Sequence, residues 1–67
     1  MGKNLAMKEA RKEKGLSQDA LATAVGVSRQ TINAIEMGDY NPTIRLCISI
    51  GRVLGLTLND LFWEEEM

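Results

Sequence analysis

The stretch that decides the fold is QDALATAVGVSRQTINAIE, residues 18–36. Its apolar side chains recur at helical spacing in two groups, Leu21, Ala22 and Val25, and then Val27, Ile32 and Ile35. Gly26 separates the two groups and supplies the backbone freedom that a sharp turn needs, while the small Ala22 lets a second helix approach closely. The stretch therefore predicts two short helices that are joined by a tight turn.

Two helices joined in this way form a helix-turn-helix, which commonly places its second helix in the major groove of DNA. If Ile32 and Ile35 face the core, the residues that face outward on the second helix are Arg29, Gln30, Asn33, Ala34 and Met37. Arginine binds guanine O6 and N7 through two hydrogen bonds, and glutamine binds adenine N6 and N7 in the same way. This face is therefore a candidate DNA-reading surface, and an ordinary solvated helix face is the competing interpretation.

Polar caps and glycines divide the chain into five expected helices, at residues 5–14, 18–25, 28–36, 44–54 and 58–62. The expected N-caps of the last four are Ser17, Ser28, Thr43 and Thr57, since a hydroxyl oxygen accepts a hydrogen bond from a free N–H of the first helical turn. On the first helix, Leu5, Met7 and Ala10 are expected to face inward. The sequence predicts an all-α fold in a single domain over residues 1–67.

The expected helix over 44–54 is more apolar than a small domain obviously needs. One stripe, expected to face the core, contains Ile44, Cys47, Ile48, Gly51 and Leu54. A second stripe contains Leu46, Ile50 and Val53, and the aromatic pair Phe62 and Trp63 follows in the sequence. We interpret this second stripe, with the aromatic pair, as a homodimer interface. The alternative, that the end of the same chain covers it, stays open.

Composition limits the remaining possibilities. A chain of 67 residues buries only about 60% of its unfolded surface, so dimerisation would reinforce it. With one cysteine, Cys47, and no histidine, neither an intrachain disulfide nor a zinc site is expected, and no cofactor or small-molecule ligand is evident. The lone thiol and the absence of a signal-peptide pattern favour a reducing cytoplasm. No apolar run approaches the roughly 20 residues of a membrane span.

Charge is distributed unevenly along the chain, although the formal net charge is only −1. Residues 1–33 contain six basic and three acidic side chains, whereas residues 34–67 contain two basic and six acidic ones. The basic half includes most of the helix-turn-helix, and a local positive potential attracts a polyanion. A mixed, solvated surface is the alternative. An enzyme is not expected, because no nucleophile lies beside a base and the acidic run 64–66 has no defined geometry.

The chain resembles the small helix-turn-helix regulators of the phage repressor and Cro (XRE-like) family. The resemblance covers about residues 7–62 and is strongest over KGLSQDALATAVGVSRQTINAIEMGDYNPT, residues 14–43. It implies a compact five-helix domain that binds operator DNA as a homodimer. Some compact members pair their chain ends as a small antiparallel sheet, which here would join Gly2–Asn4 to Phe62–Glu65.

Carried over residue by residue, the resemblance implies that Arg29, Gln30 and Ala34 read bases and that Gln18 meets a phosphate or a base. It also implies a partly buried structural ion pair between Arg11 and Glu36. The full set of expected DNA-binding residues is Gln18, Ser28, Arg29, Gln30, Thr31, Asn33, Ala34, Tyr40, Asn41 and Thr43. Met37 and Asp39 depart from the family pattern, and a carboxylate at Asp39 is unfavourable near phosphates.

Two functions follow from these expectations. The first is a sequence-specific, homodimeric transcriptional regulator that acts as a repressor by occupying its operator. The second is an antitoxin-like or protein-interaction module that uses the apolar face of the helix over 44–54. The outer face of the helix over 28–36 distinguishes them, because only the regulator requires it.

Overall fold

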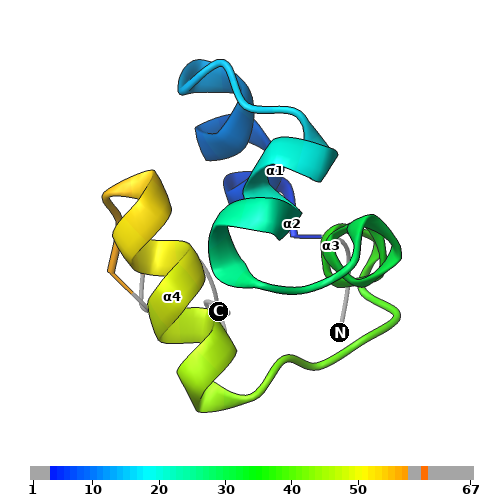
Figure 1. Ribbon diagram of the computed structural model, residues 1–67. Helices are drawn as coiled ribbons and strands as arrows, with labels where there is room; N and C mark the ends of the chain where they lie inside the picture. Colours follow the sequence, from blue (N-terminus) through cyan, green and yellow to red (C-terminus); the bar gives the residue numbers. More distant parts are fainter. Residues whose placement is uncertain (1–3, 58–59, 61–67) are drawn as a thin grey trace.

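The computed structural model describes residues 4–57 and residue 60, and the chain is all-helical within them. Its elements are α1 (Leu5–Glu13), α2 (Gln18–Val25), α3 (Arg29–Met37) and α4 (Ile44–Leu54) (Figure 1). The predicted all-α class is confirmed, and the described part of the chain contains four helices and no strand. None of the described helices is long and apolar enough to cross a membrane.

Hydroxyl side chains start three of the four helices, as the sequence predicts. Ser17, Ser28 and Thr43 each accept a hydrogen bond from the backbone N–H three residues further on, at 3.0–3.1 Å. α1 begins in the same way at Asn4, whose Oδ1 accepts from the Met7 N–H at 3.0 Å. Each such cap stabilises its helix by about 1 kcal/mol, which is why the helix starts follow from local sequence.

The turn between α2 and α3 depends on Gly26. Its φ of +79° lies in the left-handed region, where side chains with a Cβ are strained. In this conformation the N–H of Gly26 and that of Val27 both bond to the Ala22 carbonyl, at 2.8 and 3.0 Å. The chain therefore leaves α2 sharply and enters α3 at Arg29, three residues after Gly26, as the predicted helix-turn-helix requires.

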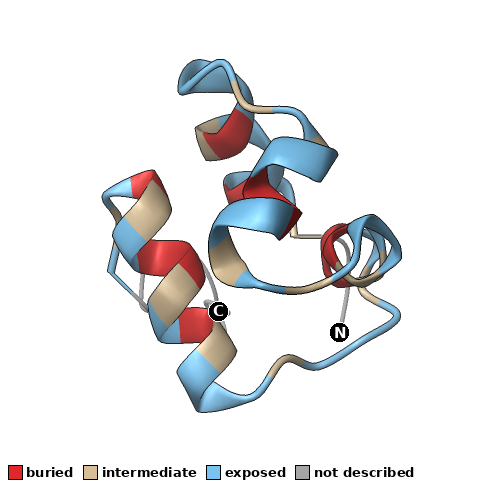
Figure 2. Cartoon of the chain, in the orientation of Figure 1, coloured by how far each residue is buried: buried red, intermediate tan, exposed pale blue. Residues whose placement is uncertain are grey.

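A single core holds the four helices together. α2 lies centrally and packs against both α3 and α4, while α1 packs against α3. Figure 2 shows that each helix turns its buried residues toward the middle of the molecule. The core cluster consists of Met7, Leu21, Ala22, Ile32, Ile35, Ile50 and Leu54. α3 is thus fixed by its inner side and leaves its outer side free.

The predicted division of α4 into a core stripe and an interface stripe is only partly correct, since Cys47, Gly51 and Leu54 of the core stripe are buried as expected. Ile50, assigned to the subunit interface, is fully buried within the subunit, and Leu46 and Val53 pack partly buried against the core. Ile44 and Ile48, assigned to the core, are 67% and 41% exposed. The core face therefore combines most of the first stripe with Ile50 of the second. A helical apolar pattern gives the width of a face, and tertiary packing decides its centre.

On α1, Met7 is buried and Ala10 partly buried as expected, but Leu5 is 59% exposed. Successive residues are about 100° apart around a helix, so Leu5 and Met7 point in nearly opposite directions. Met7 shares its face with Arg11, four residues later, and both are buried. The expectation for Leu5 was therefore wrong.

Cys47 faces the core side of α4. Its thiol lies 3.9 Å from the Pro42 carbonyl oxygen, to which it donates a weak hydrogen bond. Burial raises the pKa of the Cys47 thiol above its ordinary value. The thiol therefore remains protonated at neutral pH and packs as a small apolar group.

Residues expected to form a fifth helix fall largely outside the described residues. Thr57 and Asp60 exchange hydrogen bonds at 3.1 and 3.2 Å, each side chain accepting from the other residue's backbone N–H. This reciprocal pattern is that of a helix start. The expected terminal sheet and the expected interface residues Phe62 and Trp63 also depend on positions outside 4–57 and 60, so the five-helix count and the sheet are not supported.

Candidate nucleic-acid interface

α3 has a polar outer face, and its inner face packs against the core. Its inner face consists of Ile32, Ile35 and Glu36, all buried. Its outer face carries the expected reading residues Arg29, Gln30 and Asn33, all exposed, together with the half-buried Thr31 and Ala34 and the exposed Met37. The side chains proposed to read bases therefore project from one surface of a rigid element.

The hydroxyls at the start of α3 are already engaged within the protein. Ser28 Oγ accepts from the Thr31 N–H at 3.1 Å and lies 3.0 Å from Thr31 Oγ1. Both residues lie at the N-terminal end of α3, where the helix dipole favours a phosphate. Ser28 thus fixes the helix start, and any phosphate contact by these hydroxyls would be added to that role.

Arg29 lies beside an acidic side chain of the neighbouring helix. Its Nε is 3.7 Å from Oδ1 of Asp19, in the first turn of α2, and both side chains are more than half exposed. An exposed ion pair of this kind contributes at most about 1 kcal/mol. The guanidinium is therefore available to a stronger partner.

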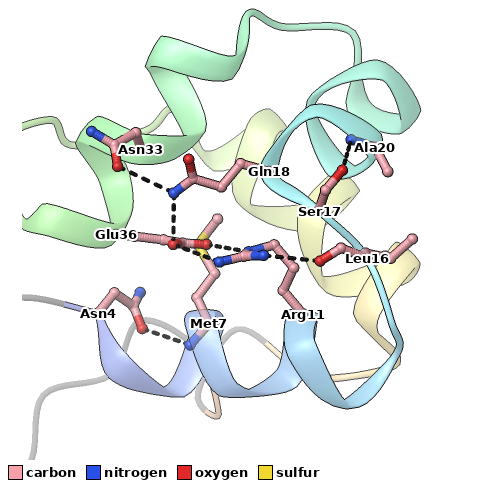
Figure 3. A network of polar contacts seen from close by, with 9 residues as sticks. All are labelled: Asn4, Met7, Arg11, Leu16, Ser17, Gln18, Ala20, Asn33 and Glu36. Carbon is pink, nitrogen blue, oxygen red and sulfur yellow. Dashed lines mark hydrogen bonds and ion pairs between the residues drawn. The ribbon is translucent and has the colours of Figure 1, made fainter.

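A buried ion pair connects α1 with the end of α3. Arg11 Nε donates to Glu36 Oε2 at 2.8 Å and Arg11 Nη2 donates to Oε1 at 3.2 Å, with both residues buried (Figure 3). Arg11 Nη1 also donates to the Leu16 carbonyl oxygen at 2.9 Å. One guanidinium thus joins α1, the turn before α2 and α3. These two residues form the buried ion pair that the resemblance implies, and the pair joins α1 to the last turn of α3.

Gln18, expected to meet DNA, also bonds to α3. Its Nε2 donates to Glu36 Oε1 and to Asn33 Oδ1, both at 3.1 Å (Figure 3). Gln18 is half-buried and Asn33 is exposed, so the pair lies at the surface directly above the buried ion pair. The structure brings Gln18 and Asn33 together, a partnership that the sequence alone did not reveal.

The expected loop residues lie at the other end of α3. Tyr40, Asn41 and Thr43 are all exposed between α3 and α4, and Thr43 caps α4. The nine residues of α3 span about 13 Å along the helix axis, which separates these residues from Arg29 and Gln30 at its start. The candidate surface therefore has two ends, one with the residues expected to read bases and one formed by the loop.

Helical spacing along α3 gives only a partial indication of the Gln18 hydrogen bonds, which the sequence analysis did not predict. Asn33 and Glu36 are three residues apart and are therefore neighbours on α3, where its outer face meets its inner face. Which residue of α2 lies opposite that face depends on how the two helices cross, and no local pattern specifies the crossing. The proximity of Asp19 to Arg29 has the same origin.

Comparison with known proteins shows which family has this fold and sequence. A family model described as Helix-turn-helix matches residues 7–61, which include all four described helices except the start of α1. The chain belongs to this helix-turn-helix family. The chain is 45% identical over 60 residues to the uncharacterized HTH-type transcriptional regulator YgzD of Bacillus subtilis (strain 168), and the match covers 90% of this chain and 91% of that protein.

Two solved structures share the fold. The restriction-modification controller protein C.AhdI from Aeromonas hydrophila is 30% identical, with a TM-score of 0.78 over 85% of this chain and 86% of that one. A chain of the SinR–SinI protein complex is 34% identical, with a TM-score of 0.79 over 87% of this chain and 57% of that one. The family is one of DNA-binding transcriptional regulators, which is not an enzyme class.

Proposed function

We propose that this helix-turn-helix protein is a homodimeric repressor that binds a specific operator and places α3 of each subunit in the major groove. The observation that carries the proposal is the exposed row of Arg29, Gln30 and Asn33 on a helix whose opposite side is buried. Long polar side chains on a rigid helix are what direct reading of base edges needs. Repression follows most simply from occupying a promoter.

Each part of the surface then has a role. The Arg29 guanidinium separates from Asp19 and binds guanine. Gln30 binds adenine. The Ala34 methyl lies against a thymine methyl or lets the helix sit deeply in the groove. The remaining expected contacts, to phosphates or to base edges, come from Gln18, Ser28, Thr31, Asn33, Tyr40, Asn41 and Thr43. Phosphate contacts fix the register, and the base contacts supply the sequence preference.

Binding should be sensitive to salt, because phosphate contacts release counterions from DNA. With roughly four to six phosphates neutralised per dimer, a fourfold rise in salt should weaken operator affinity by on the order of 10² to 10³. The measurement is a titration of a fluorescent duplex, selected from a random pool, at about 50 to 200 mM salt. A flat response to salt would contradict docking of α3 against the DNA backbone.

Two half-sites one helical turn apart, about 34 Å, require two copies of α3 on one face of the duplex. The exposed apolar side chains Ile44 and Ile48 give α4 a surface that a second copy would cover. We therefore place the subunit contact on this flank of α4, with the interface symmetric between the copies.

Replacing Ile44 and Ile48 together with aspartate should convert the dimer to monomers, since like charges would face each other across a symmetric contact. Sedimentation equilibrium measures the change, and operator affinity should fall at least about tenfold because each half-site is then bound singly. The matched control is Leu5→Asp with Ala6→Asp on α1, which replaces two exposed, uncharged side chains with the same two charges. A wild-type protein that sediments as a monomer when bound to its duplex would contradict the homodimer.

A further inference from the structure

The Glu36 carboxylate accepts every hydrogen bond that it makes, and this fixes which groups around it are donors. Glu36 is buried and its two carboxylate oxygens accept from Arg11 at 2.8 and 3.2 Å. A carboxylate that is ion-paired in this way can only accept hydrogen bonds. The atom of Gln18 that lies 3.1 Å from Glu36 Oε1 must therefore be the amine nitrogen Nε2, and the oxygen of that amide faces elsewhere.

The donor at Gln18 in turn fixes the orientation of the Asn33 amide. Gln18 Nε2 carries two hydrogens, and its second neighbour is Asn33 Oδ1 at 3.1 Å. Since Glu36 and Asn33 Oδ1 use both hydrogens, the side-chain oxygen of Asn33 faces Gln18 and its nitrogen Nδ2 faces away. Figure 3 shows the Gln18 oxygen and the Asn33 nitrogen on the sides of their amides that face away from this chain of bonds.

We propose that Gln18 is a positioning residue that fixes the direction of the Asn33 amide, so that Asn33 meets DNA as a hydrogen-bond donor. The inference rests on the proposed function, because it assigns a preference to one residue of the α3 surface. A free asparagine offers both a donor and an acceptor, and it binds adenine through both. In this protein the acceptor of Asn33 is bonded to Gln18, and the outward atom is Nδ2.

The consequence is a chemical preference at the base that Asn33 faces. A donor suits guanine, whose major-groove edge carries two acceptors, and thymine O4, whereas the N4 amine of cytosine presents only a donor. Two donors facing each other gain no hydrogen bond and lose water from both, which is unfavourable. The preference is therefore for an acceptor-bearing base, and cytosine is excluded from the contacted strand.

The internal arrangement can be tested on the protein alone. In side-chain amide NMR spectra, the Nε2 hydrogens of Gln18 should exchange with water at least about fivefold more slowly than those of the exposed Gln30, because two hydrogen bonds must break. Equal exchange rates for Gln18 and Gln30 would overturn the inference without touching the proposed function.

The preference itself is tested by selecting duplexes from a random pool with the wild-type protein and three variants. Asn33→Ala should lose base preference at one position of each half-site. Gln18→Ala should broaden the preference at that same position to include cytosine, since the freed Asn33 amide can then turn over. Thr23→Ala, at an exposed site of α2, should select the wild-type sequence.

A fourth variant separates positioning from packing. Gln18→Lys restores donors toward both Glu36 and Asn33 and should restore the exclusion of cytosine. If the wild-type protein selects a sequence and Gln18→Ala selects the same one with unchanged preference, the inference fails alone. If the wild-type protein selects no sequence, the proposed function fails and the inference fails with it.

Discussion

Replacing Arg29 and Gln30 together with alanine should abolish preferential binding to the selected operator. Each bidentate contact to a base discriminates by about 1–3 kcal/mol, and a dimer makes each contact twice. The expected loss of operator affinity is therefore at least about 10³-fold, while binding to unrelated duplex falls only slightly. Competition titration of a labelled operator against both unlabelled duplexes measures the two affinities.

This double variant should retain its fold, because both side chains are exposed and Arg29 makes only an exposed contact with Asp19. Arg52→Ala is the matched control, since it removes the same charge from an exposed position of α4. Operator binding that survives the double change would show that α3 is not the reading element. The same variant tests the protein-interaction alternative, because a partner bound at α4 would still bind.

Replacing Glu36 with alanine should destabilise the protein far more than the removal of any exposed charge. The variant leaves the Arg11 guanidinium buried without its counter-charge, which costs about 3–5 kcal/mol. In a domain of this size each kcal/mol lowers the midpoint of thermal unfolding by about 4–8 °C, so the midpoint should fall by more than about 12 °C. Circular dichroism followed against temperature gives the result.

Two further variants show whether the buried charge is the cause. Glu9→Ala removes an exposed carboxylate from α1 and should leave the midpoint nearly unchanged. Arg11→Met combined with Glu36→Leu should recover most of the loss, because an apolar pair of similar volume leaves no charge uncompensated. A Glu36→Ala midpoint within about 2 °C of wild type would contradict a stabilising role for this pair.

Helix boundaries were predictable because their causes are local. A hydroxyl at Ser17, Ser28 or Thr43 bonds to an N–H only three residues away. Gly26 adopts its left-handed conformation at the junction between α2 and α3 where the apolar pattern changes phase. Neither feature needs information from a distant part of the chain, so the helix-turn-helix could be located from residues 18–36.

The orientation of the outer elements was less predictable. Ile44 and Ile50 are equally apolar, yet one is exposed and the other is fully buried. The difference arises from how α4 rests on α2, which depends on the whole core. The same limit explains Leu5, whose side chain points away from the face that Met7 and Arg11 bury.

The candidate site contains one feature that local sequence predicts and one that depends on tertiary packing. The outward position of Arg29, Gln30 and Asn33 follows from placing Ile32 and Ile35 inside, and it was predicted from helical spacing. The bond from Gln18 to Asn33 joins residues that are 15 positions apart on different helices. It arises from the crossing of α2 and α3, so only the folded chain could identify it.

The three bonds of the Arg11 guanidinium have a thermodynamic consequence. They tie α1, the carbonyl of Leu16 and the last turn of α3 into one unit. Partial unfolding that released α1 would remove Arg11 and leave the buried Glu36 carboxylate without a counter-charge. Intermediates of this kind are therefore disfavoured. Heating should therefore remove DNA recognition and helical order in one all-or-none transition.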